Sequence, residues 1–173
     1  MLHYPLVSCI IPTYNRLHLL DRAVKSILNQ TYQNIELIVI DDNSKDNTKN
    51  LVEKYKCLYP NIMYIKQATT QGANAARNRG LYAANGEFIA GLDDDDEWMP
   101  QRIEMLLRAF EDRYAYVYSD CIEDKNGKQY IERRRPYISY GDMLAEGNIT
   151  GTQILTKTTY LIEAGGFDEN LPA

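Results

Sequence analysis

The chain has 173 residues and a formal net charge of −5, with 45% hydrophobic and 25% charged residues. This length fits one domain with a sizeable core, and the negative charge argues against nucleic-acid binding through a general basic surface. The three cysteines, Cys9, Cys57 and Cys121, are odd in number and far apart, so neither a zinc site nor a disulfide framework is indicated. The N-terminus lacks the pattern of a signal peptide, and no segment approaches about 20 apolar residues. We therefore expect a cytoplasmic protein that touches the inner face of the membrane peripherally or through residues outside this sequence, and we leave the oligomeric state open.

Apolar runs and helical spacings alternate along the first 110 residues. The pattern predicts strands over 7–11, 37–40, 62–65 and 88–92, and helices over 19–28, 45–56, 73–84 and 100–110. The run at 37–40 is apolar throughout, as expected of a strand covered on both faces. Such alternation predicts an α/β fold with a mostly parallel central sheet, helices on both faces and right-handed crossovers.

The pattern changes after Tyr114. We predict a strand over 116–121, a hairpin turn at 124–127 with a strand returning over 128–133, another strand over 153–156 and a helix over 158–163. Since no linker or repeat interrupts the chain, we expect residues 1–173 to belong to a single domain.

Three polar clusters directly follow predicted strands, at 12–15, 41–44 and 93–97. Ligands of open α/β sheets bind outside the carboxyl ends of the strands. The three clusters should therefore meet at one edge of the sheet.

The cluster at 93–97 consists of five consecutive acidic residues between Leu92 and Trp98. Clustered carboxylates repel one another, and a bound cation relieves that repulsion. If the loop is extended, Asp93 and Asp95 project to the same side. They could then hold Mn2+ or Mg2+ together with a diphosphate. The alternative is a solvated acidic loop with no ligand.

Other candidate residues have two interpretations each. Asp42 could accept hydrogen bonds from a base or ribose, or could serve turn and cap chemistry. Tyr14 could stack on a base or pack in the core. Arg77 could face phosphates or lie on a solvated helix face. The run at 133–135 could meet an anionic acceptor or a lipid headgroup, or could be solvated.

Several segments together resemble family 2 glycosyltransferases of the GT-A fold, a Rossmann-like fold that binds nucleotide-sugars. They are 7–15, 28–32, 36–44, 76–80, 92–100 with its Asp-x-Asp, and 165–169. Their order and spacing cover nearly the whole chain. The resemblance implies donor-binding roles for Pro12, Thr13, Tyr14, Asp42, Arg77, Asp93 and Asp94, and metal ligation by Asp95 and Asp93.

The resemblance also implies an activity. It is the inverting, metal-dependent transfer of a sugar from a nucleoside-diphosphate sugar, expected to be a UDP-sugar, to a saccharide or lipid-linked acceptor in bacterial surface polysaccharide or glycoconjugate synthesis. Residues 1–110 would form the nucleotide-binding half and 111–173 the start of the acceptor half. In the family the general base follows the segment that 165–169 resembles, so we expect the base beyond Ala173 and the chain to be C-terminally truncated. Two rivals are a donor-binding module without turnover and a non-catalytic metal-binding protein.

Overall fold

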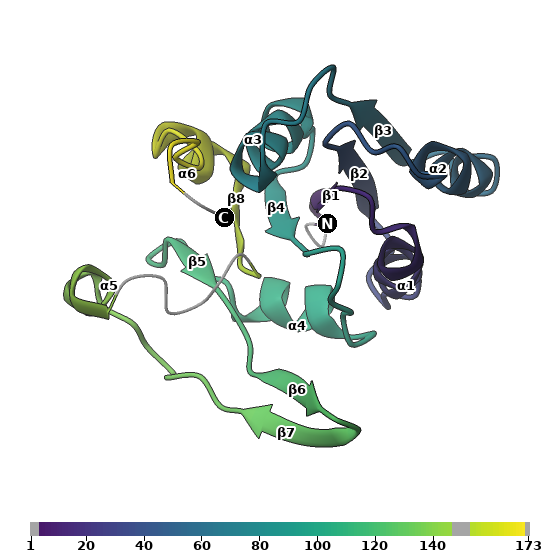
Figure 1. Cartoon of the computed structure of the whole chain (residues 1–173). Helices are drawn as coiled ribbons and strands as arrows, with labels where there is room; N and C mark the ends of the chain where they lie inside the picture. The colour runs from purple at the N-terminus through teal and green to yellow at the C-terminus, as the bar shows by residue number, and fades with distance from the viewer. Residues whose placement is uncertain (1–3, 147–152, 172–173) are drawn as a thin grey trace.

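A six-stranded sheet forms the centre of the computed structural model, which describes residues 4–146 and 153–171 (Figure 1). Its strands are β1 (Val7–Thr13), β2 (Ile35–Asp41), β3 (Ile62–Lys66), β4 (Phe88–Gly91), β5 (Tyr116–Val117) and β8 (Leu155–Lys157). They lie in the order β3-β2-β1-β4-β8-β5. The strands β1 to β4 are parallel to one another, whereas β8 runs antiparallel to both β4 and β5. The predicted mostly parallel α/β sheet is confirmed.

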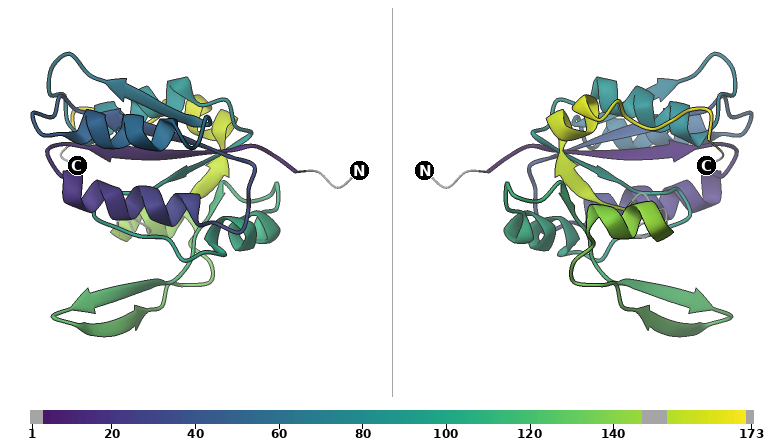
Figure 2. Two further views of the ribbon diagram at one scale, coloured as in Figure 1. Left: turned by 90° about the vertical axis from the view of Figure 1, so that its right-hand side faces the viewer. Right: turned by 90° about the vertical axis from the view of Figure 1, so that its left-hand side faces the viewer.

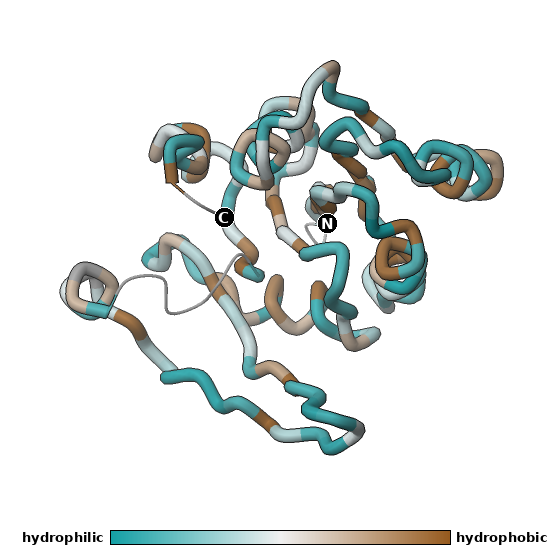
Figure 3. The backbone as a smooth tube through the Cα atoms, viewed as in Figure 1, coloured by the Kyte–Doolittle hydropathy of each residue, from teal (hydrophilic) through white to brown (hydrophobic). Residues whose placement is uncertain are grey.

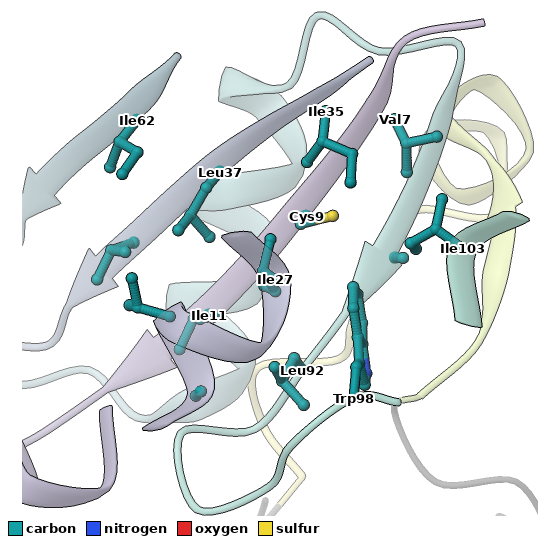
Figure 4. Close-up of a cluster of buried hydrophobic side chains, with 14 of the residues drawn as sticks. Val7, Cys9, Ile11, Ile27, Ile35, Leu37, Ile62, Leu92, Trp98 and Ile103 are labelled. Atoms are coloured by element: carbon teal, nitrogen blue, oxygen red, sulfur yellow. The ribbon is translucent and has the colours of Figure 1, made fainter. Parts of the chain in front are cut away.

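Helices cover both faces of this sheet. They are α1 (Leu17–Leu28), α2 (Thr48–Lys56), α3 (Ala73–Ala83), α4 (Arg102–Ala109), α5 (Tyr140–Glu146) and α6 (Thr158–Glu163). Since strand side chains alternate between faces, Cys9 and Ile11 of β1 join one apolar cluster with residues of α1, α2 and α4 (Figure 4). Ile10 joins a second cluster with residues of α3 and α6. No helix within the described ranges is long and apolar enough to cross a membrane.

A two-stranded hairpin stands apart from these layers. Its strands β6 (Cys121–Lys125) and β7 (Lys128–Glu132) project away from the sheet in both side views (Figure 2). Every residue of β7 is exposed. The hairpin is mainly hydrophilic, whereas the central strands are apolar (Figure 3).

Several predicted boundaries are wrong, each for a local reason. The single strand predicted over 116–121 is split between β5 and β6, and α5 matches no predicted element. The first strand continues past Pro12, because β4 pairs with β1 only as far as Ile10, so the proline ring faces a local sheet edge. The helix predicted from residue 45 starts at Thr48, whose amide donates to the Asp46 carboxylate at 3.1 Å. The helix predicted from residue 100 starts at Arg102.

Candidate active site

The strand order creates a crevice at the carboxyl ends of β1 and β4. From β1 the chain continues to β2 and β3 on one side and returns to β4 on the other, which is the switch point where open α/β sheets bind ligands. A cleft of about 310 Å³ lies there. It is lined by Pro12, Thr13, Tyr14, Arg16, Asp42, Ala73, Ala76, Arg77, Asp93, Asp94 and Asp95. Every donor-binding and metal residue expected from the sequence is in this set.

A larger hollow of about 710 Å³ lies elsewhere, lined by residues between Ala109 and Asp120 and between Arg134 and Met143. None of the polar clusters directly after β1, β2 and β4 lines this hollow. Chemistry, rather than size, therefore selects the smaller cleft as the candidate site.

The acidic loop is a turn and not an extended segment. The amide of Asp96 donates to the carbonyl of Asp93 at 3.1 Å, so the alternation expected to place Asp93 and Asp95 on one side does not apply. Arginines hold the carboxylates instead. Asp93 is 2.8 Å from Arg77, and Asp94 and Asp95 are each 3.1 Å from Nη1 of Arg16.

Two carboxyls of this loop are poorly solvated. Burial raises the pKa of Asp94 even though the Thr13 hydroxyl, 2.7 Å away, and Arg16 favour its ionised form. Burial, and next the charges of Asp93 and Asp95, raise the pKa of Asp96. The fold thus stores negative charge at one end of β4, a setting that attracts a cation.

Asp42 organises the loop that leads into α3. Its Oδ1 accepts from Nε2 of Gln67 and from the amide of Gln71, each at 2.7 Å, and its Oδ2 accepts from the amide of Gly72 at 2.8 Å. A carboxylate offers about four acceptor positions. One acceptor position on Oδ2 is therefore not used by these three bonds, and Asp42 lines the cleft.

The loops after β1 and β2 are tied to each other. Asn15, at a positive φ of 54°, donates its amide to the Ser44 hydroxyl at 2.9 Å, and its side-chain oxygen accepts from the amide of Lys45 at 2.7 Å. The neighbouring Tyr14 is half-exposed at the cleft. Core packing is therefore the wrong interpretation of Tyr14.

Arg77 is held in place from three sides. Its guanidinium contacts Asp93, donates to the side-chain oxygen of Asn74 at 3.0 Å, and lies 5.9 Å from the Phe167 ring centre. The next residue, Asn78, bonds both the amide and the carbonyl of Phe167 at 2.8 Å. The segment at 165–169 thus packs on α3, and a solvated helix face is excluded for Arg77.

Three lining residues of the cleft were not expected from the sequence: Arg16, Ala73 and Ala76. Arg16 directly follows the polar cluster at 12–15, which was the available signal. The two alanines lie three positions apart on α3, where residues share one helix face, and their small side chains leave space in the cleft.

A family model described as glycosyl transferase family 2 matches residues 8–166. A GalNAc(5)-diNAcBac-PP-undecaprenol beta-1,3-glucosyltransferase of Campylobacter jejuni is 42% identical over 71% of the chain and 40% of its own length. A UDP-Glc:alpha-D-GlcNAc-diphosphoundecaprenol beta-1,3-glucosyltransferase of Escherichia coli is 38% identical over 88% of the chain and 61% of its own length.

Solved structures show the same fold. A mannosyltransferase from Pyrobaculum calidifontis in complex with GDP-Man and Mn2+ has a TM-score of 0.76 at 22% identity, over 98% of this chain and 49% of that one. The S. aureus protein TarS in complex with UDP has a TM-score of 0.73 at 25% identity, over 97% of this chain and 52% of that one. The chain thus spans about half the length of the proteins it matches. By its family match and its GT-A fold, the chain belongs to glycosyl transferase family 2.

Proposed function

We propose that the chain forms the donor side of an inverting, metal-dependent glycosyltransferase that moves a sugar from a UDP-sugar to a saccharide or lipid-linked acceptor. The observation that carries this proposal is that the loops after β1, β2 and β4 meet Arg77 in one cleft. The glucosyltransferases named above have diphosphoundecaprenol-linked substrates in their names. We extend that acceptor class to this chain and place it in bacterial surface polysaccharide or glycoconjugate synthesis at the inner face of the membrane.

The base and ribose would lie between the loops after β1 and β2. Tyr14 offers an exposed ring on which a base stacks, and the remaining acceptor position of Asp42 suits a base N–H or a ribose hydroxyl. Pro12 and Thr13 complete this wall of the cleft. Thr13 also donates to Asp94 at 2.7 Å, so in this proposal the ribose would lie next to the acidic loop.

The diphosphate would lie between Arg77 and the acidic loop. Asp93 and Asp95 supply hard oxygen ligands, which suit Mn2+ or Mg2+. The described residues hold no cluster of three or more His, Cys, Asp or Glu side chains arranged for a metal, so the ion would complete its shell from the diphosphate and water. When bound, the ion neutralises the charge of the departing diphosphate. Arg77 adds a fixed positive charge to the same oxygens.

We further propose that residues 1–110 form the nucleotide-binding half and 111–173 begin the acceptor side. Inversion requires a carboxylate that takes the proton of the attacking hydroxyl. Glu169 does not fit that role, because its Oε1 accepts a hydrogen bond from the side-chain Nδ2 of Asn78 at 2.8 Å. We assign the general base to none of the carboxylates in the cleft.

Calorimetry with UDP, with and without Mn2+, tests the donor site. Wild-type protein should bind UDP more tightly when Mn2+ is present, and Asp95→Asn should abolish that gain without changing the circular dichroism spectrum. Asp112→Asn, an exposed aspartate that lies outside the cleft, is the matched control. Unchanged Mn2+ dependence in Asp95→Asn would remove the metal assignment.

Base preference provides a second test. Tyr14→Ala should weaken UDP binding by about 1 to 3 kcal/mol, the range for stacking of one base on an aromatic ring. Wild type should prefer UDP to GDP and CDP, and Asp42→Ala should reduce that preference. Tyr82→Ala serves as control, because Tyr82 is exposed on α3 and absent from the cleft lining. If Tyr14→Ala and Asp42→Ala bind all three nucleotides as wild type does, the base lies elsewhere.

A further inference from the structure

Arg16 is the charged residue among the three cleft residues that were not expected from the sequence. It lies at the start of α1, where its carbonyl accepts from the amides of Leu19 and Leu20 at 2.9 and 3.0 Å. Its backbone is therefore fixed by the helix. Its guanidinium extends to the acidic loop, 78 positions along the chain, and reaches Asp94 and Asp95.

The two carboxylates that Arg16 bridges differ in their surroundings. The Asp94 side chain is 6% exposed, whereas those of Arg16 and Asp95 are 52% and 50% exposed. Asp94 is also held by Thr13. An exposed ion pair is weak and easily exchanged, whereas a buried, hydrogen-bonded carboxylate keeps its partner. Arg16 therefore has one firm contact, with Asp94, and one labile contact, with Asp95.

Asp95 is also the carboxylate assigned to the metal, so Arg16 and a divalent cation compete for it. Resting on the proposed function, we infer that Arg16 is the resident counter-ion of the acidic loop and becomes a phosphate ligand. A divalent cation that arrives with the nucleotide takes Asp95 from Arg16. The guanidinium, still anchored on Asp94, then binds the diphosphate.

The chemistry of the guanidinium fits this exchange. Arginine keeps its charge throughout and suits both carboxylate and phosphate oxygens. Arg77 contacts Asp93 in the same cleft. The two arginines would therefore approach the diphosphate from two different elements, Arg16 from the start of α1 and Arg77 from α3.

Arg22 provides a matched control at the same loop. It is as exposed as Arg16 and pairs with Glu97 at 3.5 Å, while its Nη2 donates to the carbonyl of Asp95 at 3.3 Å. It does not line the cleft. Arg22→Gln removes the same charge from the edge of the loop and leaves the Asp94 and Asp95 carboxylates with Arg16.

Two binding measurements on the 173-residue chain test the inference. Free Mn2+ counted by electron paramagnetic resonance gives the affinity for Mn2+ alone, and calorimetry at saturating Mn2+ gives the affinity for UDP. Arg16→Gln should bind Mn2+ alone about tenfold more tightly, because a neighbouring positive charge is gone. It should bind UDP about tenfold more weakly, because a charged hydrogen-bond donor is lost. Arg22→Gln should change neither affinity by more than about twofold.

The opposite changes in Mn2+ affinity and UDP affinity distinguish this role from a structural one. A residue that merely shapes the loop would weaken both affinities when replaced, and that outcome, or unchanged Mn2+ binding, overturns the counter-ion role. Unchanged UDP affinity overturns the phosphate contact. Arg16→Lys, which keeps the charge, should bind Mn2+ as wild type does and UDP with intermediate affinity, and it serves if Arg16→Gln does not fold. If wild type itself binds no UDP, the proposed function fails. If wild type binds UDP and Arg16→Gln behaves as Arg22→Gln does, only this inference fails.

Discussion

The first part of the chain (residues 4–110) and the second part (residues 111–146 and 153–171) differ in the contacts that hold their loops. In the first part, Asp42 and Asp94 follow buried strands and accept hydrogen bonds from other segments. In the second part, β6 and β7 pair with each other in a separate two-stranded sheet, and both members of the opposed pair Ile122 and Ile131 are exposed. A two-stranded hairpin is at best marginally stable in water without further packing.

This contrast indicates which part of the chain can hold binding side chains in a fixed arrangement. Polar side chains keep a fixed arrangement when a packed sheet fixes their backbone. Thr13, Asp42 and Asp94 meet that condition, because all three are buried at strand ends. In contrast, the strand β7 and Arg133 are exposed. We therefore propose that donor binding belongs to the first part, and that the second part supplies an adaptable surface.

The largest effect should come from matched isoleucines in the two parts. Ile38 of β2 is 0% exposed and Ile131 of β7 is 66% exposed. Ile38→Ala should cost about 2 to 5 kcal/mol of unfolding free energy through lost burial and a cavity. Ile131→Ala should stay within about 0.5 kcal/mol. Urea unfolding measures both, and a cost above 1 kcal/mol for Ile131→Ala would show that the hairpin packs against another surface.

Replacing each of two glycines with alanine should change stability by less, and in opposite directions at the two positions. A Cβ at Gly86 would lie 2.7 Å from the amide nitrogen of Ser8 and 2.8 Å from the carbonyl of Leu6, and backbone cannot move cheaply. Gly86→Ala should therefore cost about 1 to 3 kcal/mol. At Gly141 in α5 the nearest atom is the Ser139 hydroxyl at 3.6 Å. Gly141→Ala should gain about 0.4 to 1 kcal/mol, and thermal melts of both variants test this reversal.

The fold of the first part could be predicted because its signals are local. Continuous apolar runs marked the buried strands, and the carboxyl ends of parallel strands converge by geometry alone. That rule brought Tyr14, Asp42 and Asp93 to one edge before any contact was known. It could not give the shape of the acidic loop, where contacts from Arg16 and Arg77 hold the carboxylates.

The second part resisted prediction for the opposite reason. Its strands bury little, so apolar periodicity is weak and the boundary between β5 and β6 has no sequence marker. The partners of Asp42 were equally out of reach, because Gln71 and Gly72 lie in a loop about 30 positions away, and nothing in the sequence specifies the path of that loop. Long-range hydrogen bonds that involve no periodic pattern must be seen in the structure.

Replacing two aspartates with asparagine should change the free energy of unfolding in opposite directions. Burial raises the pKa of Asp96, so its contribution to stability is present below the unfolded pKa of about 3.9 and is lost as pH rises through the folded value. Hydrogen bonds from Ser139 lower the pKa of Asp142, so its contribution is present above the unfolded pKa and is lost as pH falls through the folded value. At about pH 7, Asp96→Asn should therefore stabilise the chain and Asp142→Asn should destabilise it. Urea unfolding at about pH 4 and pH 7 tests both, and equal signs at pH 7 would contradict the assigned surroundings.

The smallest effect concerns the rates at which three thiols react with a disulfide reagent. Cys57 is exposed, Cys121 is partly buried in β6, and Cys9 is fully buried in β1. Burial raises the pKa of the Cys9 and Cys121 thiols, which disfavours the reactive thiolate in both.

The two buried thiols differ in the opening that exposes them. Cys121 needs only separation of the hairpin, whereas Cys9 needs the central sheet to unfold, and local opening costs less than global unfolding. In native buffer Cys57 should react first and Cys121 later, and Cys9 should react only at the rate of unfolding. Mass spectrometry after timed quenching assigns each site, and Cys57→Ser removes the fast phase as a control.

Adding urea below the unfolding transition should then accelerate the reaction of Cys121 less than that of Cys9, because separating the hairpin exposes less new surface. If Cys121 is instead as protected as Cys9, the hairpin is covered in solution, and the contrast between the two parts of the chain does not hold.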